Sequence, residues 1–190
     1  MGRHRAILIG TILSMIVFGN SDPRAADRLD LAAFREGALQ QHNVYRAKHG
    51  SPPLVLSPQL NEVAQHHAEQ LARAKQLVHS AQEPYGENLY ASHGSNATPP
   101  RPETVVDSWY NERQHYDFNQ PGFRPDTGHF TQVVWKGSHE LGMGIAQASD
   151  GTWYVVGNYR PSGNIANQFA TNVLKPAHEG EYSSGKAGER

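Results

Sequence analysis

Residues 128–135 of the chain read GHFTQVVW, a short run of β-branched and aromatic residues that begins with a glycine and a histidine. β-Branched and aromatic side chains favour strands, so this run predicts a short strand. With a period of two, each face mixes apolar and polar side chains: His129 and Val133 on one face, Phe130 and Gln132 on the other. Both faces are therefore expected to be covered. His129 is then either a core imidazole bonded to a carbonyl group or part of a functional site.

Three helices are predicted before this strand. Apolar residues recur at three- and four-residue steps over residues 31–48, and Gly50 follows as a stop signal. A second helix begins near Ser57, with Pro58 in its first turn, and carries its own apolar stripe. A third helix begins near Pro102.

The buried stripe of the third helix contains a carboxylate, Glu112, between Trp109 and Tyr116. A buried carboxylate without a partner costs several kcal/mol, so Glu112 needs a cation, a metal ion or hydrogen-bond donors. A salt bridge to an arginine or a bond from a backbone amide would meet this need as well as a metal ion would.

Two further strands are predicted over residues 140–148 and 153–159, joined by a hairpin turn at Asp150-Gly151. They are expected to pair in antiparallel fashion. The first of them alternates bulky residues with small ones, namely Leu141, Met143 and Ile145 with Gly142, Gly144 and Ala146. Its small-residue face would let a helix approach closely. Helices followed by a hairpin-connected sheet predict an α+β layered domain.

Four stretches resemble, in order, the motifs of the CAP superfamily, which contains cysteine-rich secretory proteins, venom antigen five and group-one plant pathogenesis-related proteins. They are residues 42–50 (HNVYRAKHG), the turn-like 85–89 (YGENL), 129–135 (HFTQVVW) and 157–165 (GNYRPSGNI). The similarity extends over residues 39–176. The resemblance implies a three-layer α-β-α sandwich with a small antiparallel sheet.

Composition limits the class of protein. A chain of 190 residues has room for one such domain, which we assign to residues 31–176. The net charge of −1 gives no bulk attraction to nucleic acid. The absence of cysteine excludes disulfides and thiol chemistry, and it makes the chain similar to the cysteine-free branch of the superfamily. Residues 177–190 are polar and are expected to form a disordered tail.

The N-terminus has the layout of a secretory signal. Basic residues precede an apolar run over residues 6–18, and small or polar residues follow at 19–21. We expect cleavage of residues 1–21 and a secreted, extracellular protein, or a periplasmic one in a bacterium, without an integral membrane segment in the mature chain. An uncleaved anchor is the alternative. Asn96 begins a glycosylation sequon that a eukaryotic host could use.

By resemblance, His79, Glu87, Glu112 and His129 match the family's cavity tetrad, in which the histidines bind a divalent ion and the glutamates line the same pocket. Neutral imidazoles and carboxylates suit Zn²⁺, and two protein nitrogens leave positions open for water. We assign His79 and His129 as metal ligands, with Glu87 and Glu112 acting through water or from behind the ligands. Such a site would hold its metal loosely. A purely structural ion site is the alternative.

No catalytic residue is assigned. His66, His67 and Glu69 lack the spacing of zinc-protease ligands. Ser92 could be imagined as a nucleophile beside His79, but the sequence places no carboxylate to orient that histidine.

Three functions are compatible with these residues. The first is a secreted binding module for a sterol or other lipid, a ligand class that the resemblance implies. The second is a metal-dependent hydrolase or protease, and the third is an extracellular, defence-related interaction protein without catalysis.

Overall fold

The computed structural model of the protein describes residues 29–81, 84–93 and 98–177. The predicted signal over residues 1–21, the sequon at Asn96 and residues 178–190 of the predicted tail lie outside these ranges. Within them, no helix has both the length and the apolar character that crossing a bilayer would require.

The three predicted helices are present. α1 (Leu31–Lys48) is capped by Asp30, whose carboxylate accepts hydrogen bonds from the first free backbone amides, and Gly50 follows with a φ of +63°. α2 spans Pro58–Ala74, and α3 spans Pro102–Asn111 with a 3₁₀ turn, η2, over Glu112–His115. The apolar periodicity of the sequence, with Pro58 and Pro102 in the first turns of α2 and α3, located these helices.

A four-stranded sheet forms the middle of the molecule, in the order β1-β3-β4-β2. β3 (Glu140–Gln147) and β4 (Trp153–Arg160) are the predicted antiparallel hairpin. β1 (Val55–Leu56) pairs in parallel with β3, and β2 (Gly86–Ser92) pairs with β4 in antiparallel fashion. Residues 85–89 were interpreted as a turn. That interpretation is wrong for most of the motif, because β2 begins at Gly86 and the motif becomes a strand by pairing with β4.

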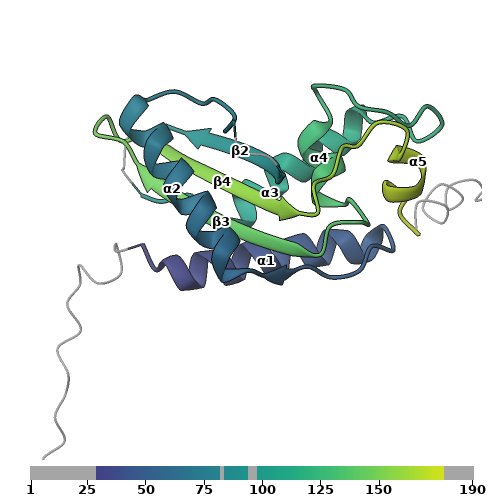
Figure 1. Ribbon diagram of the computed structural model, residues 1–190, viewed down its shortest axis with the longest axis horizontal. Coiled ribbons are helices and arrows are strands. Elements are labelled where there is room, and N and C mark those ends of the chain that lie inside the picture. The colour runs from purple at the N-terminus through teal and green to yellow at the C-terminus, as the bar shows by residue number, and fades with distance from the viewer. Residues whose placement is uncertain (1–28, 82–83, 94–97, 178–190) are drawn as a thin grey trace, which may run out of the picture.

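The elements form three layers, with α2 in front of the strands and α3 behind them (Figure 1). α2 lies very close to the small-residue face of β3, as predicted. A Cβ atom on Gly142 would lie 2.2 Å from the carbonyl carbon of Leu60, and one on Gly144 would lie 2.3 Å from that of Ala64. On the other side, α1 and α3 pack against the bulky face and against each other around a core that contains Trp109.

Residues 128–135 do not form the predicted strand. Gly128–Val133 form a short helix, α4, instead. Its first amides, those of His129 and Phe130, donate to one carboxylate oxygen of Glu112 over 2.9 and 3.2 Å. These bonds satisfy the helix start, and they outweigh the strand preference of the β-branched residues.

Candidate functional site

His129 and Glu112 form the first histidine–carboxylate pair of the predicted tetrad. Nδ1 of His129 lies 2.6 Å from Oε1 of Glu112, while Oε2 of the same carboxylate accepts the two backbone amides at the start of α4. Glu112 therefore has both kinds of partner considered for it, an imidazole and backbone donors. The Trp109 ring stacks on His129 with centroids 6.4 Å apart. The His129 side chain keeps 31% of its surface exposed.

Two asparagines hold the backbone around His129. The side-chain amide of Asn88, on β2, donates to the carbonyl oxygen of His129 over 3.1 Å. The amide of Asn164 donates to the carbonyl oxygen of Gly128 over 2.9 Å, and its oxygen accepts from the Thr131 hydroxyl over 2.6 Å. Both asparagines lie in the motif-like stretches 85–89 and 157–165. The sequence analysis assigned them no role, although their place in those motifs was an available signal.

His79 and Glu87 form the second pair. Nδ1 of His79 lies 2.9 Å from Oε1 of Glu87, and this oxygen also accepts the backbone amide of Ser80 over 2.9 Å. The bond to Glu87 raises the pKa of His79 above its usual value, although burial acts to lower it. Burial also acts to raise the pKa of Glu87, but the bonds from His79 and Ser80 outweigh it and leave the pKa below its ordinary value.

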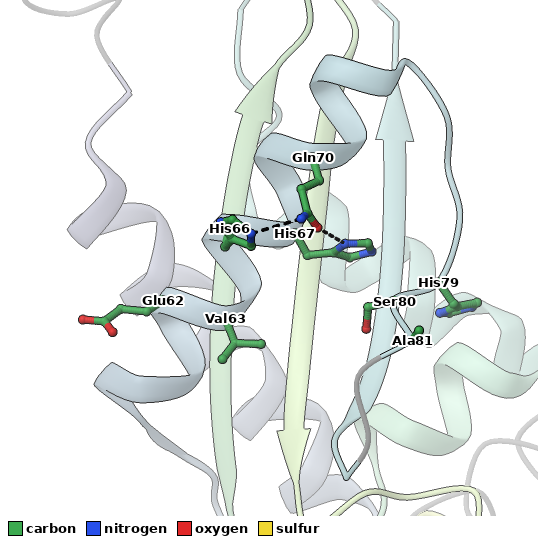
Figure 2. A pocket seen from close by; sticks show the side chains of 8 residues that line it. All are labelled: Glu62, Val63, His66, His67, Gln70, His79, Ser80 and Ala81. Carbon is green, nitrogen blue, oxygen red and sulfur yellow. Dashed lines mark hydrogen bonds between the residues drawn. The ribbon is translucent and has the colours of Figure 1, made fainter.

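A cavity of about 530 Å³ opens between α2 and residues 79–81 (Figure 2). Gln70 lies between His66 and His67 and bridges their imidazoles. Nε2 of His67 also lies 3.0 Å from the carbonyl oxygen of Val78, to which it donates. That hydrogen bond engages Nε2 of the buried His67 imidazole, and Nδ1 of the same ring lies 3.3 Å from the side-chain oxygen of Gln70. His79 lines the side of the cavity across from α2.

Consecutive residues of β2 contact the two pairs. The Glu87 carboxylate bonds the His79 imidazole, and the Asn88 side chain donates to the backbone carbonyl group of His129. Within the described residues, no three His, Asp or Glu side chains lie close enough together to hold an ion. The structure thus brings the four predicted residues together as two pairs. Whether both histidines bind one ion stays a prediction.

Each histidine by itself has the donor chemistry of a metal ligand. A carboxylate at Nδ1 fixes the orientation of the ring and leaves Nε2 as the ligand atom. In such a site the glutamates would stand behind the histidines, and that role stays a prediction. The residue types therefore fit a divalent ion such as Zn²⁺.

The imagined pairing of Ser92 with His79 does not form. Ser92 lies at the far end of β2, opposite Trp153 and five residues from Glu87, which is about 17 Å along a strand. The expectation that no carboxylate orients His79 is also wrong, because Glu87 does so.

An exposed apolar side chain lies beside the start of α4. Phe123 keeps 60% of its surface exposed, and its ring carbon Cε2 would be 3.1 Å from a Cβ atom built on Gly128. Ile165 is 41% exposed and directly follows Asn164, which bonds the carbonyl oxygen of Gly128. The exposed Phe123 ring thus lies against Gly128, the residue before His129.

Comparison with known proteins identifies relatives over most of the chain. The model of the cysteine-rich secretory protein family (CAP) matches residues 39–159. Human Golgi-associated plant pathogenesis-related protein 1 is 45% identical over 149 residues, which cover 75% of this chain and 94% of that protein. Pathogenesis-related protein 1C of Nicotiana tabacum is 35% identical over 83% of this chain and 89% of that protein. Protein PRY2 of Saccharomyces cerevisiae is 40% identical over 74% of this chain, but the match spans only 41% of PRY2.

Solved structures share the fold at lower sequence identity. NaASP2 aligns with a TM-score of 0.60 and 20% identity, covering 79% of this chain and 88% of that one. BmVAL-1 aligns with a TM-score of 0.59 and 22% identity, covering 84% of each chain. The layered arrangement is therefore shared with both proteins.

Proposed function

Because this chain belongs to the cysteine-rich secretory protein (CAP) family, as a member without cysteine, we propose that it is a secreted binding module. It takes a sterol or another lipid beside a divalent-metal site built on His79 and His129. One observation carries the lipid part of this proposal, namely the exposed Phe123 ring that lies over Gly128, next to His129.

The surroundings of Phe123 support a ligand that has both apolar and polar parts. Phe123 offers exposed apolar surface over Gly128, and the imidazole of His129 offers a polar group one residue further along. Exposed apolar surface that is grouped beside polar groups commonly marks a binding site. A sterol, with a rigid apolar body and one hydroxyl group, has matching chemistry.

The metal part of the proposal is supported by the two histidine–carboxylate pairs. NaASP2, which shares the fold, has been crystallised with Zn²⁺. A bound Zn²⁺ would supply open coordination positions for water or for a polar group of the ligand. Metal binding requires neutral imidazoles, so protons compete with the ion, and the affinity falls in acid.

Lipid binding is tested by fluorescent-sterol binding and competition with unlabelled sterol, in wild type and in Phe123→Asp. We expect the variant to bind at least tenfold more weakly, because a carboxylate replaces the apolar contact surface. Val55→Asp is the matched control, since Val55 is exposed to 59% and lies on β1. Equal sterol affinity in wild type and Phe123→Asp would contradict the lipid site.

Metal binding is tested by calorimetric titration of the wild-type protein with ZnCl₂ at pH 7, beside His79→Ala, His129→Ala and the double variant. If one ion is shared, each single change removes the binding. If the ions are separate, each single change removes one of two binding events. His66→Ala, in the neighbouring cavity, serves as the control. No binding in wild type would remove the metal from the proposal and leave the lipid site.

A metal-dependent hydrolase is the second candidate, because Glu87 orients His79 as a carboxylate orients a catalytic imidazole. It requires measurable ester or peptide hydrolysis that chelation and Glu87→Ala both abolish. A protein that acts through its surface alone would instead keep its biological activity when all four tetrad side chains are replaced.

A further inference from the structure

A chain of hydrogen bonds runs through the core from α1 to the backbone of His129. Nδ1 of His42 lies 2.7 Å from the carbonyl oxygen of Ala38, and Nε2 of the same ring lies 2.8 Å from the Tyr159 hydroxyl. The side-chain nitrogen of Asn88 lies 3.2 Å from that hydroxyl and 3.1 Å from the carbonyl oxygen of His129. All three side chains are at most 1% exposed, so bulk water does not compete for these bonds.

The chemistry of the two ends fixes the direction of every bond. A carbonyl oxygen only accepts, so His42 carries its proton on Nδ1, and the amide nitrogen of Asn88, rather than its oxygen, faces His129. Burial lowers the pKa of His42 to about 4, which keeps the ring neutral and makes Nε2 an acceptor. Tyr159 must therefore donate to His42, and its oxygen accepts from Asn88.

We propose that Asn88 is a positioning residue for His129. The hydrogen bonds that link His42, Tyr159 and Asn88 hold the Asn88 side-chain amide in a single orientation. The two hydrogens of the Asn88 amide group are both engaged, one at Tyr159 and one at His129. Rotating the amide by 180° would place its oxygen against the carbonyl oxygen of His129 and would break both bonds.

The chain complements the hold that Glu112 has on the same residue. Glu112 accepts the amide and the Nδ1 hydrogen of His129, whereas Asn88 donates to its carbonyl group. Glu112 therefore holds the two N–H groups of His129, and Asn88 holds its carbonyl oxygen. The claim about position rests on these contacts, and only its effect on a metal ion rests on the proposed function.

The direction of the chain is tested by nuclear magnetic resonance on the full-length ¹⁵N-labelled protein at pH 7. Two-bond proton–nitrogen correlations report which ring nitrogen of His42 carries the proton, and we expect Nδ1. In Asn88→Asp the new carboxylate only accepts, so the Tyr159 hydroxyl turns toward it. His42 must then carry a proton on Nε2 as well as the one that Nδ1 donates to Ala38, which makes the ring an imidazolium. A purely packing role for Asn88 would leave the ring unchanged.

The effect on His129 is tested in Asn88→Ala, which avoids a buried charge and serves where Asn88→Asp does not fold. We expect shifted His129 resonances and Zn²⁺ affinity about tenfold weaker than in wild type, in the range typical for partners that orient a ligand. Asn43→Ala is the control, because the Asn43 amide likewise bonds two groups, the backbone N–H and C=O of Leu54. It should change neither the His42 tautomer nor the His129 resonances.

An Nε2–H tautomer of His42 in wild type would overturn the proposal. Unchanged His129 resonances in folded Asn88→Ala would overturn it as well. Wild-type protein that binds no Zn²⁺ would instead count against the proposed metal site, and the tautomer and the His129 resonances would still decide the role of Asn88.

Discussion

At the scale of single residues, the buried core contains a full positive charge. Arg46 is completely buried, and its guanidinium donates to four backbone carbonyl groups, those of Pro52, Val133, Trp135 and Ser138. Burial lowers the pKa of Arg46 to about 10, so the group stays charged at neutral pH. Two of these carbonyls lie at the end of α4, where a helix carries partial negative charge. Arg46 thus fixes the end of α4 to α1.

We expect Arg46→Lys to lower the free energy of unfolding by about 3 kcal/mol, because a compact ammonium group cannot reach four carbonyls that a planar guanidinium fork reaches. Urea denaturation followed by circular dichroism measures the change. Arg73→Lys is the control, since Arg73 is exposed on α2 and pairs with Glu69 at 3.8 Å. Equal stability of wild type and Arg46→Lys would contradict this account.

His42 predicts a specific loss of stability in acid. Its pKa is about 4 in the folded protein and about 6.5 in the unfolded chain, so the unfolded chain binds more protons between these values. The contribution of the neutral His42 ring to the free energy of unfolding is complete above pH 6.5. It is lost as the pH falls toward 4, by about 3 kcal/mol in total.

Urea denaturation at a series of pH values compares wild type with His42→Gln. The variant should be less stable at pH 7 but lose less stability on acidification. Burial also lowers the pKa of His49, and because that residue is present in both proteins, the difference between them isolates His42. Parallel pH profiles would disprove the assignment.

At the scale of elements, the close approach of α2 to the sheet depends on two glycines of β3. We expect Gly144→Ala to destabilise the protein by about 3 kcal/mol, because its Cβ atom would meet the backbone of α2 at 2.3 Å and the backbone cannot yield as a side chain can. Thermal unfolding measures the effect. Gly122→Ala is the control, since a Cβ atom there meets nothing within 4 Å. A fully stable Gly144→Ala would mean that α2 can move outward at little cost.

The same two elements show what the sequence could predict. The contact between α2 and β3 was predictable because the alternation of glycine with bulky residues is a local pattern. The helix α4 was not, because residues 129–135 prefer a strand locally and the decisive carboxylate, Glu112, lies 17 residues before His129. β2 was missed for a similar reason, since its partner β4 lies about 70 residues further along the chain.

The candidate site, too, has one part that could be predicted from the sequence and one part that could not. The four residues could be chosen from motifs and residue chemistry, and so could the idea that carboxylates stand behind the histidines. Their grouping into two pairs depends on the register of β2, in which neighbouring side chains leave a strand on opposite faces. The separation of Ser92 from His79 could not be predicted, because it depends on the length of that strand.

At the scale of the whole molecule, residues 174–177 are hydrogen-bonded to the C-terminal end of α1. The carbonyl oxygen of Leu174 accepts from Nδ1 of the buried His49, and the amide of Ala177 donates to the carbonyl oxygen of Lys48 over 3.1 Å. We expect a chain that ends at Val173 to melt about 5 °C below one that ends at Ala177, because a buried imidazole loses its acceptor. Differential scanning calorimetry of the two chains measures this. Identical melting temperatures would show that water replaces Leu174 without loss.

The order of strands in the sheet has a consequence for how the protein is made. In this sheet β1 pairs with β3, and β2 pairs with β4. The first two strands are therefore synthesised before either of their partners. The sheet cannot be completed until Arg160, the last residue of β4, has been synthesised and released. Such a high contact order favours slow folding and leaves unpaired strand edges open to other chains. A protein with this topology is therefore expected to depend on chaperones during synthesis more than its modest length suggests.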